Sequence, residues 1–66
     1  MGEKVLIFKD MRQQEAFRKA LEKASFEADI RHDNGWPKPA LRVRGVNPSH
    51  ILAASFWAGF EPEAVL

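Results

Sequence analysis

Two histidines and the aspartates near them are the side chains best suited to acid–base or metal chemistry. His32 and His50 do not form the HxH or HxxxH spacing by which one element presents two ligands to a metal ion. The chain has no cysteine, which excludes disulfides, iron–sulfur clusters and thiolate-bound zinc. The remaining residues do not supply a nucleophile with a base and an orienting partner. We therefore predict a protein that is not an enzyme and that uses neither a metal nor a cofactor.

Asp10 follows the apolar run of residues 4–9, and the polar residue Gln13 comes three positions after it. An aspartate in this place resembles the metal-binding aspartate of small ferredoxin-like nucleases, a resemblance that covers one residue. Asp10 and Gln13 also form the capping-box pattern that begins an α-helix. We interpret Asp10 as a helix N-cap.

The segment 47–60 is unusual because no charged side chain lies between His50 and Glu61. Asn47 is typical of a helix N-cap, and Gly59 is typical of a left-handed helix C-cap. A helix at the surface of a 66-residue protein normally has a polar face. Either the rest of the chain covers this helix almost all round, or a second molecule covers it.

Aromatic and arginine side chains near this segment are residue types that often anchor protein interfaces. Trp36 lies in a loop between a glycine and a proline, where it is either a lid on the sheet edge or a contact residue. The apolar residues of 47–60 would form the centre of a contact, with arginines at its rim. The predicted partner-binding residues are Trp36, Arg42, Arg44, Leu52, Phe56, Trp57 and Phe60.

A local basic patch between Arg31 and Arg44 suggests an alternative. With an aromatic residue of the first strand, it would form a platform like those that bind single-stranded RNA, and the layout resembles that of RNA-recognition domains. The net charge of +1, from 10 basic and 9 acidic residues, argues against a general nucleic-acid binder. The residues of this alternative are Phe8, Arg31, Lys38, Arg42 and Arg44.

A strand and a helix are predicted in the first part of the chain. The apolar run 4–9 is too short for a helix and predicts a strand with both faces at least partly covered. A helix is predicted from Met11 to about Ser25, with a charged outer face. Its apolar stripe consists of Met11, Phe17, Ala20, Leu21 and Ala24.

Residues 27–33 and 39–45 alternate strictly between inward and outward side chains, which predicts two half-buried strands. The Trp-Pro-Lys-Pro sequence between them predicts a hairpin with a long loop. Placed antiparallel, the strands bring their three arginines onto one outer face together with Asp29 and Asp33. Opposite charges on neighbouring strands stabilise an exposed sheet face.

The predicted order is β-α-β-β-α, and residues 61–66 add either a short edge strand or a loose tail. Because each element has one apolar face, two helices should cover one face of an antiparallel sheet. With right-handed crossovers, this is an α+β fold with the ferredoxin-like split β-α-β layout. We predict a single compact domain over residues 1–66. A layout that is reused so widely implies no function.

The chain has no apolar stretch of the roughly 20 residues that span a bilayer and no signal-peptide pattern at its N-terminus. We predict a cytoplasmic protein that does not enter membranes. The leading hypothesis is a small non-enzymatic protein-binding module, a regulator or inhibitor that occludes or bridges the surface of an unknown protein partner. Its size suits a phage or bacterial accessory protein. A nucleic-acid-binding module and a self-associating homodimer are the alternatives.

Overall fold

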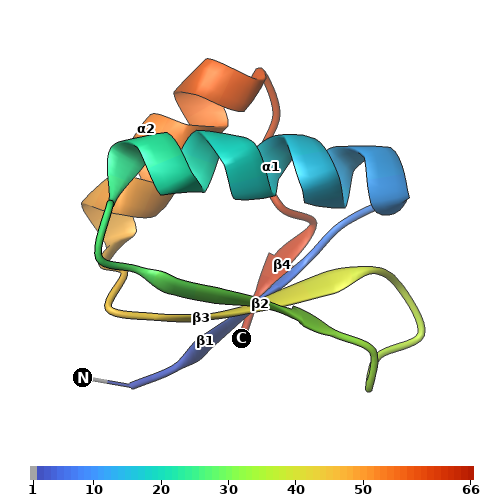
Figure 1. Ribbon diagram of the computed structural model, residues 1–66. Helices are drawn as coiled ribbons and strands as arrows, with labels where there is room; N and C mark the ends of the chain where they lie inside the picture. Colours follow the sequence, from blue (N-terminus) through green and yellow to red (C-terminus); the bar gives the residue numbers. More distant parts are fainter. Residues whose placement is uncertain (1) are drawn as a thin grey trace.

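A computed structural model describes residues 2–66, and the elements follow in the order β-α-β-β-α-β (Figure 1). The predicted order of strands and helices is therefore confirmed, and residues near the C-terminus add a short strand. The elements are β1 (Lys4–Ile7), α1 (Met11–Ala24), β2 (Asp29–Asp33), β3 (Ala40–Arg44), α2 (Pro48–Ala58) and β4 (Ala64–Val65).

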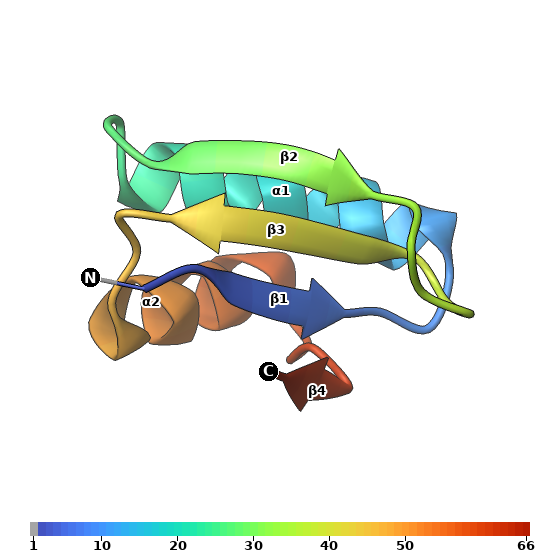
Figure 2. The ribbon, with the colours of Figure 1, turned by 90° about the horizontal axis from the view of Figure 1, so that it is seen from below.

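The four strands form one open sheet in the order β2-β3-β1-β4, and each neighbouring pair is antiparallel. The helices α1 and α2 pack together on one face of this sheet, and the other face is open (Figure 1, Figure 2). The α+β class and the placement of both helices on one face agree with the prediction. The Cα positions extend over 26 × 25 × 15 Å, so the domain is a flat, two-layer structure.

Helix α1 begins at the predicted N-cap. The Asp10 carboxylate accepts a 2.9 Å hydrogen bond from the backbone N–H of Gln13. The Gln13 side-chain oxygen accepts a hydrogen bond from the N–H of Lys9. In a regular capping box it would accept from the N–H of the N-cap residue itself, Asp10. The end of the helix at Ala24 agrees with the predicted end near Ser25.

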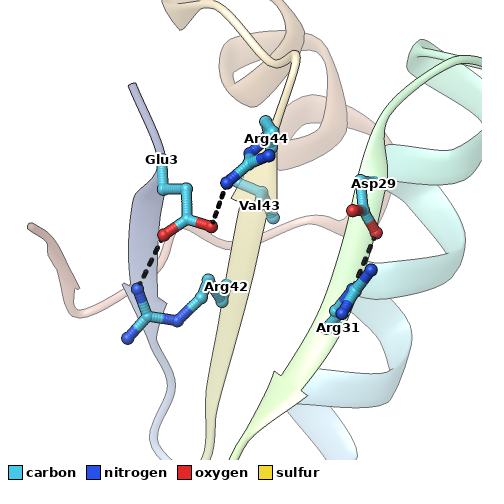
Figure 3. Close-up of a pocket in the computed structure, with 6 residues that line it drawn as sticks. All are labelled: Glu3, Asp29, Arg31, Arg42, Val43 and Arg44. Carbon is cyan, nitrogen blue, oxygen red and sulfur yellow. Dashed lines mark hydrogen bonds and ion pairs between the residues drawn. The ribbon is translucent and has the colours of Figure 1, made fainter. Parts of the chain in front are cut away.

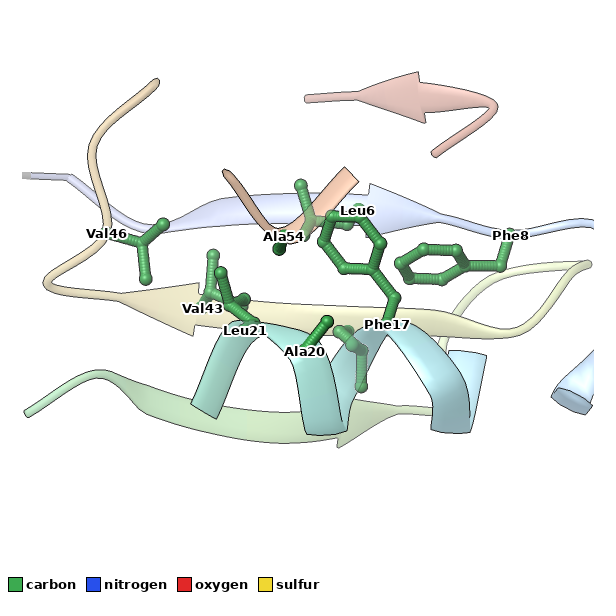
Figure 4. Close-up of a cluster of buried hydrophobic side chains, with 9 residues drawn as sticks. Leu6, Phe8, Phe17, Ala20, Leu21, Val43, Val46 and Ala54 are labelled. Atoms are coloured by element: carbon green, nitrogen blue, oxygen red, sulfur yellow. The ribbon is translucent and has the colours of Figure 1, made fainter. Parts of the chain in front are cut away.

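The core lies between the sheet and the helices and contains two phenylalanines whose rings pack together at a tilt (Figure 4). Phe8 and Phe17 are completely buried, and their ring centroids lie 5.2 Å apart. Phe60 packs on the same cluster, with its ring centroid 6.1 Å from that of Phe17. Phe8 is thus not available to stack on a base, contrary to our expectation. Leu6 of β1 and Phe8, which directly follows β1, both point towards the helices, so the alternate residues of the strand lie on the open face.

The apolar stripe of α1 differs from the predicted one in its first turn. Phe17, Ala20 and Leu21 are buried as predicted, but Met11 is 74% exposed. Gln14 is buried instead, and its amide donates a 2.7 Å hydrogen bond to the carbonyl of Ala40. A polar side chain therefore joins α1 to the start of β3 at the position where we expected apolar contact to begin.

Helix α2 is capped at both ends by the residues that predicted it. The Asn47 side chain accepts a 3.1 Å bond from the N–H of His50, and His50 Nδ1 accepts a 3.2 Å bond from the N–H of Asn47. This reciprocal pair is a capping box in which His50 takes the usual place of a glutamate. At the other end, Gly59 has a φ of +86°, the left-handed conformation expected of a C-cap glycine.

Strand β4 is short but well paired with β1. Leu66 and Val5 exchange two backbone hydrogen bonds of 2.8 and 3.0 Å, and the N–H of Glu63 bonds to the carbonyl of Ile7 at 2.7 Å. Pro62 precedes the strand, where it does not interrupt the pairing. Of the two alternatives left by the sequence, the edge strand is correct.

Candidate functional site

A row of uncovered apolar side chains runs along α2, and we call Leu52, Ala53, Phe56 and Trp57 the α2 apolar face. Leu52 is 72% exposed, Phe56 84% and Trp57 62%, and Ala53 is also exposed. Residues three and four positions apart are neighbours on a helix surface, so these side chains form one continuous stripe. The helix is apolar on both sides, and the fold covers one of them.

Small residues attach the opposite side of α2 to the core. Ala54 is fully buried, and Ile51 and Ala58 pack against the core cluster. The Ser55 hydroxyl donates a 2.8 Å hydrogen bond to the carbonyl of Ile51 and so needs no partner from another element. Because the inward positions hold mainly alanine and isoleucine, the bulkiest side chains of the helix point outward.

Helix α1 borders one side of the α2 apolar face and gives it a basic edge. Trp57 shares a shallow groove with Lys19 and Lys23 of α1. The Lys23 ammonium lies 5.6 Å from the centroid of the Trp57 ring, which is within the range of a cation–π contact. Both lysines are exposed, and the ion pairs found within residues 2–66 involve neither of them.

The chain after α2 borders the other side of the α2 apolar face and gives it an acidic edge. Leu52 and Phe56 line a groove of about 350 Å³ together with Phe60 and Glu61. Phe60 is half-buried because its ring packs on the core, so it belongs to the core and to the groove wall at once. Glu61 is exposed, and in the described part of the chain it is not among the paired carboxylates.

The open face of the sheet carries an ionic network centred on Arg42, part of which is drawn in Figure 3. Arg42 donates to Glu3 at 3.0 Å and to Asp33 at 2.9 and 3.2 Å. Glu3 also accepts a 2.9 Å bond from Arg44 (Figure 3). One guanidinium therefore ties the segment before β1 to the end of β2 across the width of three strands.

Arg31 and Lys38 are paired with carboxylates as well. Arg31 donates to Asp29 of the same strand at 3.1 Å (Figure 3), and the Lys38 ammonium lies 2.6 Å from Glu63. The register places Arg31 beside Arg42 on the open face, as predicted from the alternation of the strands. These carboxylates reduce the free positive charge of the open face. A nucleic-acid phosphate would have to compete with them for the basic side chains.

The hydrogen bonds of the network keep its carboxyl groups ionised. Bonds from the β3 arginines, Arg42 first, lower the pKa of Glu3 below its ordinary value. The pKa of Asp33 is lowered first by the backbone N–H of Gly35, and then by the Trp36 indole and by Arg42. These groups are thus fixed as ions in the neutral range, where a general acid or base would need to change its protonation state.

Trp36 is held against the sheet. Its indole N–H donates a 2.9 Å bond to the Asp33 carboxylate, whose other oxygen accepts a 3.0 Å bond from the N–H of Gly35. The side chain is half-buried. Of the two roles that the sequence left open, this geometry favours a lid on the hairpin loop over a free contact residue.

The two histidines lie in different parts of the domain. His32 Nε2 is 3.9 Å from a Glu15 carboxylate oxygen at an exposed edge between β2 and α1, while His50 belongs to the cap of α2. Residues 2–66 contain no group of three or more histidine, cysteine, aspartate or glutamate side chains placed to hold a metal ion.

None of the helices described is both long and apolar enough to cross a membrane.

The predicted partner-binding residues lie on opposite faces of the domain. Leu52, Phe56 and Trp57 lie on the outer side of the helix layer, whereas Arg42 and Arg44 lie on the open face of the sheet. One contact surface cannot include both sets in a two-layer structure. The helix and the arginines are therefore separate candidate sites.

Phe26 is an exposed aromatic residue that the sequence patterns did not single out. It is 94% exposed and lies in the turn between α1 and β2. Phe26 belongs neither to the predicted apolar stripe of the first helix nor to the predicted strand 27–33, and this position could have indicated that its side chain is exposed. Because it does not belong to the α2 apolar face, Phe26 provides a matched control for Phe56.

No protein-family model, curated protein or solved structure matches this chain. The two faces of the domain, the apolar one on α2 and the ionic one on the sheet, are therefore the features that bear on its function.

Proposed function

We propose that this chain is a small non-enzymatic protein-binding module that regulates or inhibits a partner by occluding or bridging its surface. The observation that carries the proposal is the α2 apolar face, on which Leu52, Phe56 and Trp57 are 72%, 84% and 62% exposed. An exposed apolar patch on a small protein usually marks a partner surface. Both ends of α2 are capped, so the helix presents these side chains from a fixed backbone.

The size of the α2 apolar face fits a contact of moderate strength. Fully covered aromatic side chains bury about 150–250 Å² each, so at their exposures Phe56 and Trp57 together offer on the order of 300 Å². Leu52 and Ala53 bring the patch to roughly 400–500 Å², within the range of about 300–600 Å² found for the largest apolar patch of a typical monomer, which is often functional. Standard interfaces bury about 800 Å² per partner, so we expect affinity in the micromolar range.

The charges around the patch define what kind of surface fits it. Its centre carries no charge, its α1 side carries Lys19 and Lys23, and its other side carries Glu61. A complementary partner presents an apolar centre with acidic residues opposite the lysines and a basic residue opposite Glu61.

Nucleic-acid binding, the alternative on the open face, has weaker support. Arg31, Arg42 and Arg44 do share that face, which favours binding to phosphates. Each of them also donates to a carboxylate, and Phe8 is buried in the core. If this alternative held, Arg42→Ala with Arg44→Ala would weaken binding and reduce its salt dependence.

For the fold, we propose the ferredoxin-like split β-α-β layout. The position of β3 between β1 and β2, antiparallel to both, supports it, and so does β4 on the far side of β1. This layout adds no functional information, because many unrelated activities use it.

Capture of partners from source cells, with matched variants, tests the proposed function. Phe56→Ser and Phe26→Ser each remove a phenylalanine that is mostly exposed, 84% and 94% respectively, but only the first lies on the α2 apolar face. We expect the wild type and Phe26→Ser to retain one stoichiometric protein after nuclease treatment, and Phe56→Ser to lose it. Capture that vanishes with nuclease, or that Phe56→Ser leaves unchanged, would reject the proposed surface.

A further inference from the structure

We infer that the partner that covers the α2 apolar face is a second copy of this chain, with the two α2 helices parallel about a two-fold axis that runs along them. The inference rests on the proposed function, because it names the partner of the same surface. Three properties of that surface support it: its neutral centre, the placement of its aromatic rings and the charges at its edges.

The centre of the α2 apolar face is complementary to itself. The chain has no charged side chain between His50 and Glu61, so two copies can meet there without burying like charges. Two patches of roughly 400–500 Å² each would remove about 900 Å² from water, and the flanking edges add to this area. The total approaches the roughly 1,200 Å² at the lower end of specific interfaces, as expected for a dimer of micromolar affinity.

The aromatic side chains fit a parallel pair of helices. Trp57 lies on the α1 side of the stripe, and Phe56 lies on the other side beside the groove of about 350 Å³. A two-fold axis along α2 exchanges the two sides, so Trp57 of each copy faces the Phe56 groove of the other. The two residues are adjacent in the sequence and therefore lie at nearly the same height along the axis, which allows both rings to insert at once.

The charges at the edges select the same arrangement. With the axis along the helices, the Lys19 and Lys23 edge of one copy lies opposite the Glu61 edge of the other, on both sides of the dimer. An antiparallel pair, with its axis across the helices, would place lysines opposite lysines. Unlike charges at a rim favour the correct orientation, and like charges oppose the wrong one.

Sedimentation equilibrium of the purified chain tests whether the second copy binds. Between about 10 µM and 1 mM, we expect the mass to rise from 7.5 kDa to twice that value. Phe56→Ser should weaken the dimer at least tenfold, and Phe26→Ser should leave it unchanged. A wild-type chain that stays monomeric at about 1 mM would overturn the inference, and the capture experiment would still decide the proposed function.

A charge swap tests the orientation of the two copies. Lys23→Glu and Glu61→Lys should each weaken the dimer about two- to fivefold at low salt, and the double variant should recover most of the loss. Lys23→Gln is the reference, because it removes the contact with Trp57 without reversing the charge. If the double variant is as weak as the single variants combined, while Phe56→Ser still dissociates the dimer, the parallel arrangement is wrong.

Discussion

The exposed position of Phe56 predicts that its removal hardly affects the stability of the isolated domain. Phe56 is 84% exposed, so its buried part corresponds to roughly 30 Å² of a side chain of about 200 Å². At about 25 cal/mol per Å², Phe56→Ala should cost under ~1 kcal/mol. Phe17 is completely buried against Phe8, and Phe17→Ala should cost about 3–5 kcal/mol. That loss is comparable to the whole stability of about 3–10 kcal/mol expected for 66 residues.

Urea unfolding followed by circular dichroism would measure both changes. The protein concentration should be about 1 µM, so that dissociation of a micromolar dimer does not contribute to the transition. We expect Phe56→Ala to keep the wild-type slope and to shift the midpoint slightly, and Phe17→Ala to be largely unfolded. A loss above about 2 kcal/mol for Phe56→Ala would show instead that the ring is part of the core of the domain.

The remaining predictions concern the ionic network and the cap of α2. Asp33 has a lowered pKa in the folded state, so it stabilises the fold at pH values above its ordinary value of 3.8, and this contribution is lost as the pH falls through the folded-state pKa. Asp33→Asn should therefore lower the urea midpoint at neutral pH and flatten its decline below about pH 4; parallel profiles for variant and wild type would contradict this. Asn47→Ala removes the acceptor for the N–H of His50 and should cost about 1 kcal/mol in thermal or urea unfolding, whereas Asn47→Asp, the control, should be close to wild type. Equal losses in both variants would show that the side-chain oxygen is not what stabilises the helix end.

Local signals in the sequence were sufficient for the order of the elements and for the ends of the two helices, whereas the three strands predicted at 4–9, 27–33 and 39–45 are each shorter in the structure. Asp10, Asn47 and Gly59 act through hydrogen bonds or backbone angles within a few residues, and the structure confirms all three caps. The alternation of β2 and β3 also specified which of their side chains share a face, because the period of a strand is two residues.

Features that depend on contacts between residues far apart in the sequence could not be predicted from local signals. The sequence showed that Leu6 and Phe8 share a side of β1, but which side faces the helices depends on how the sheet assembles. The burial of Gln14 depends on a carbonyl of β3, which is far from it in the sequence. The separation of the arginines from α2 depends likewise on the two layers of the fold.

The two tryptophans give the domain separate optical reporters. The chain has no tyrosine, so emission excited in the long-wavelength absorption band of indole comes from its two tryptophans. Trp57 is 62% exposed on α2, whereas the half-buried Trp36 donates its N–H to Asp33 at the hairpin loop. Emission from Trp57 should shift to shorter wavelength when another molecule covers the helix, and emission from Trp36 should respond when the loop opens. With Trp36 replaced by phenylalanine, a single fluorescence titration would follow binding at α2 without any label.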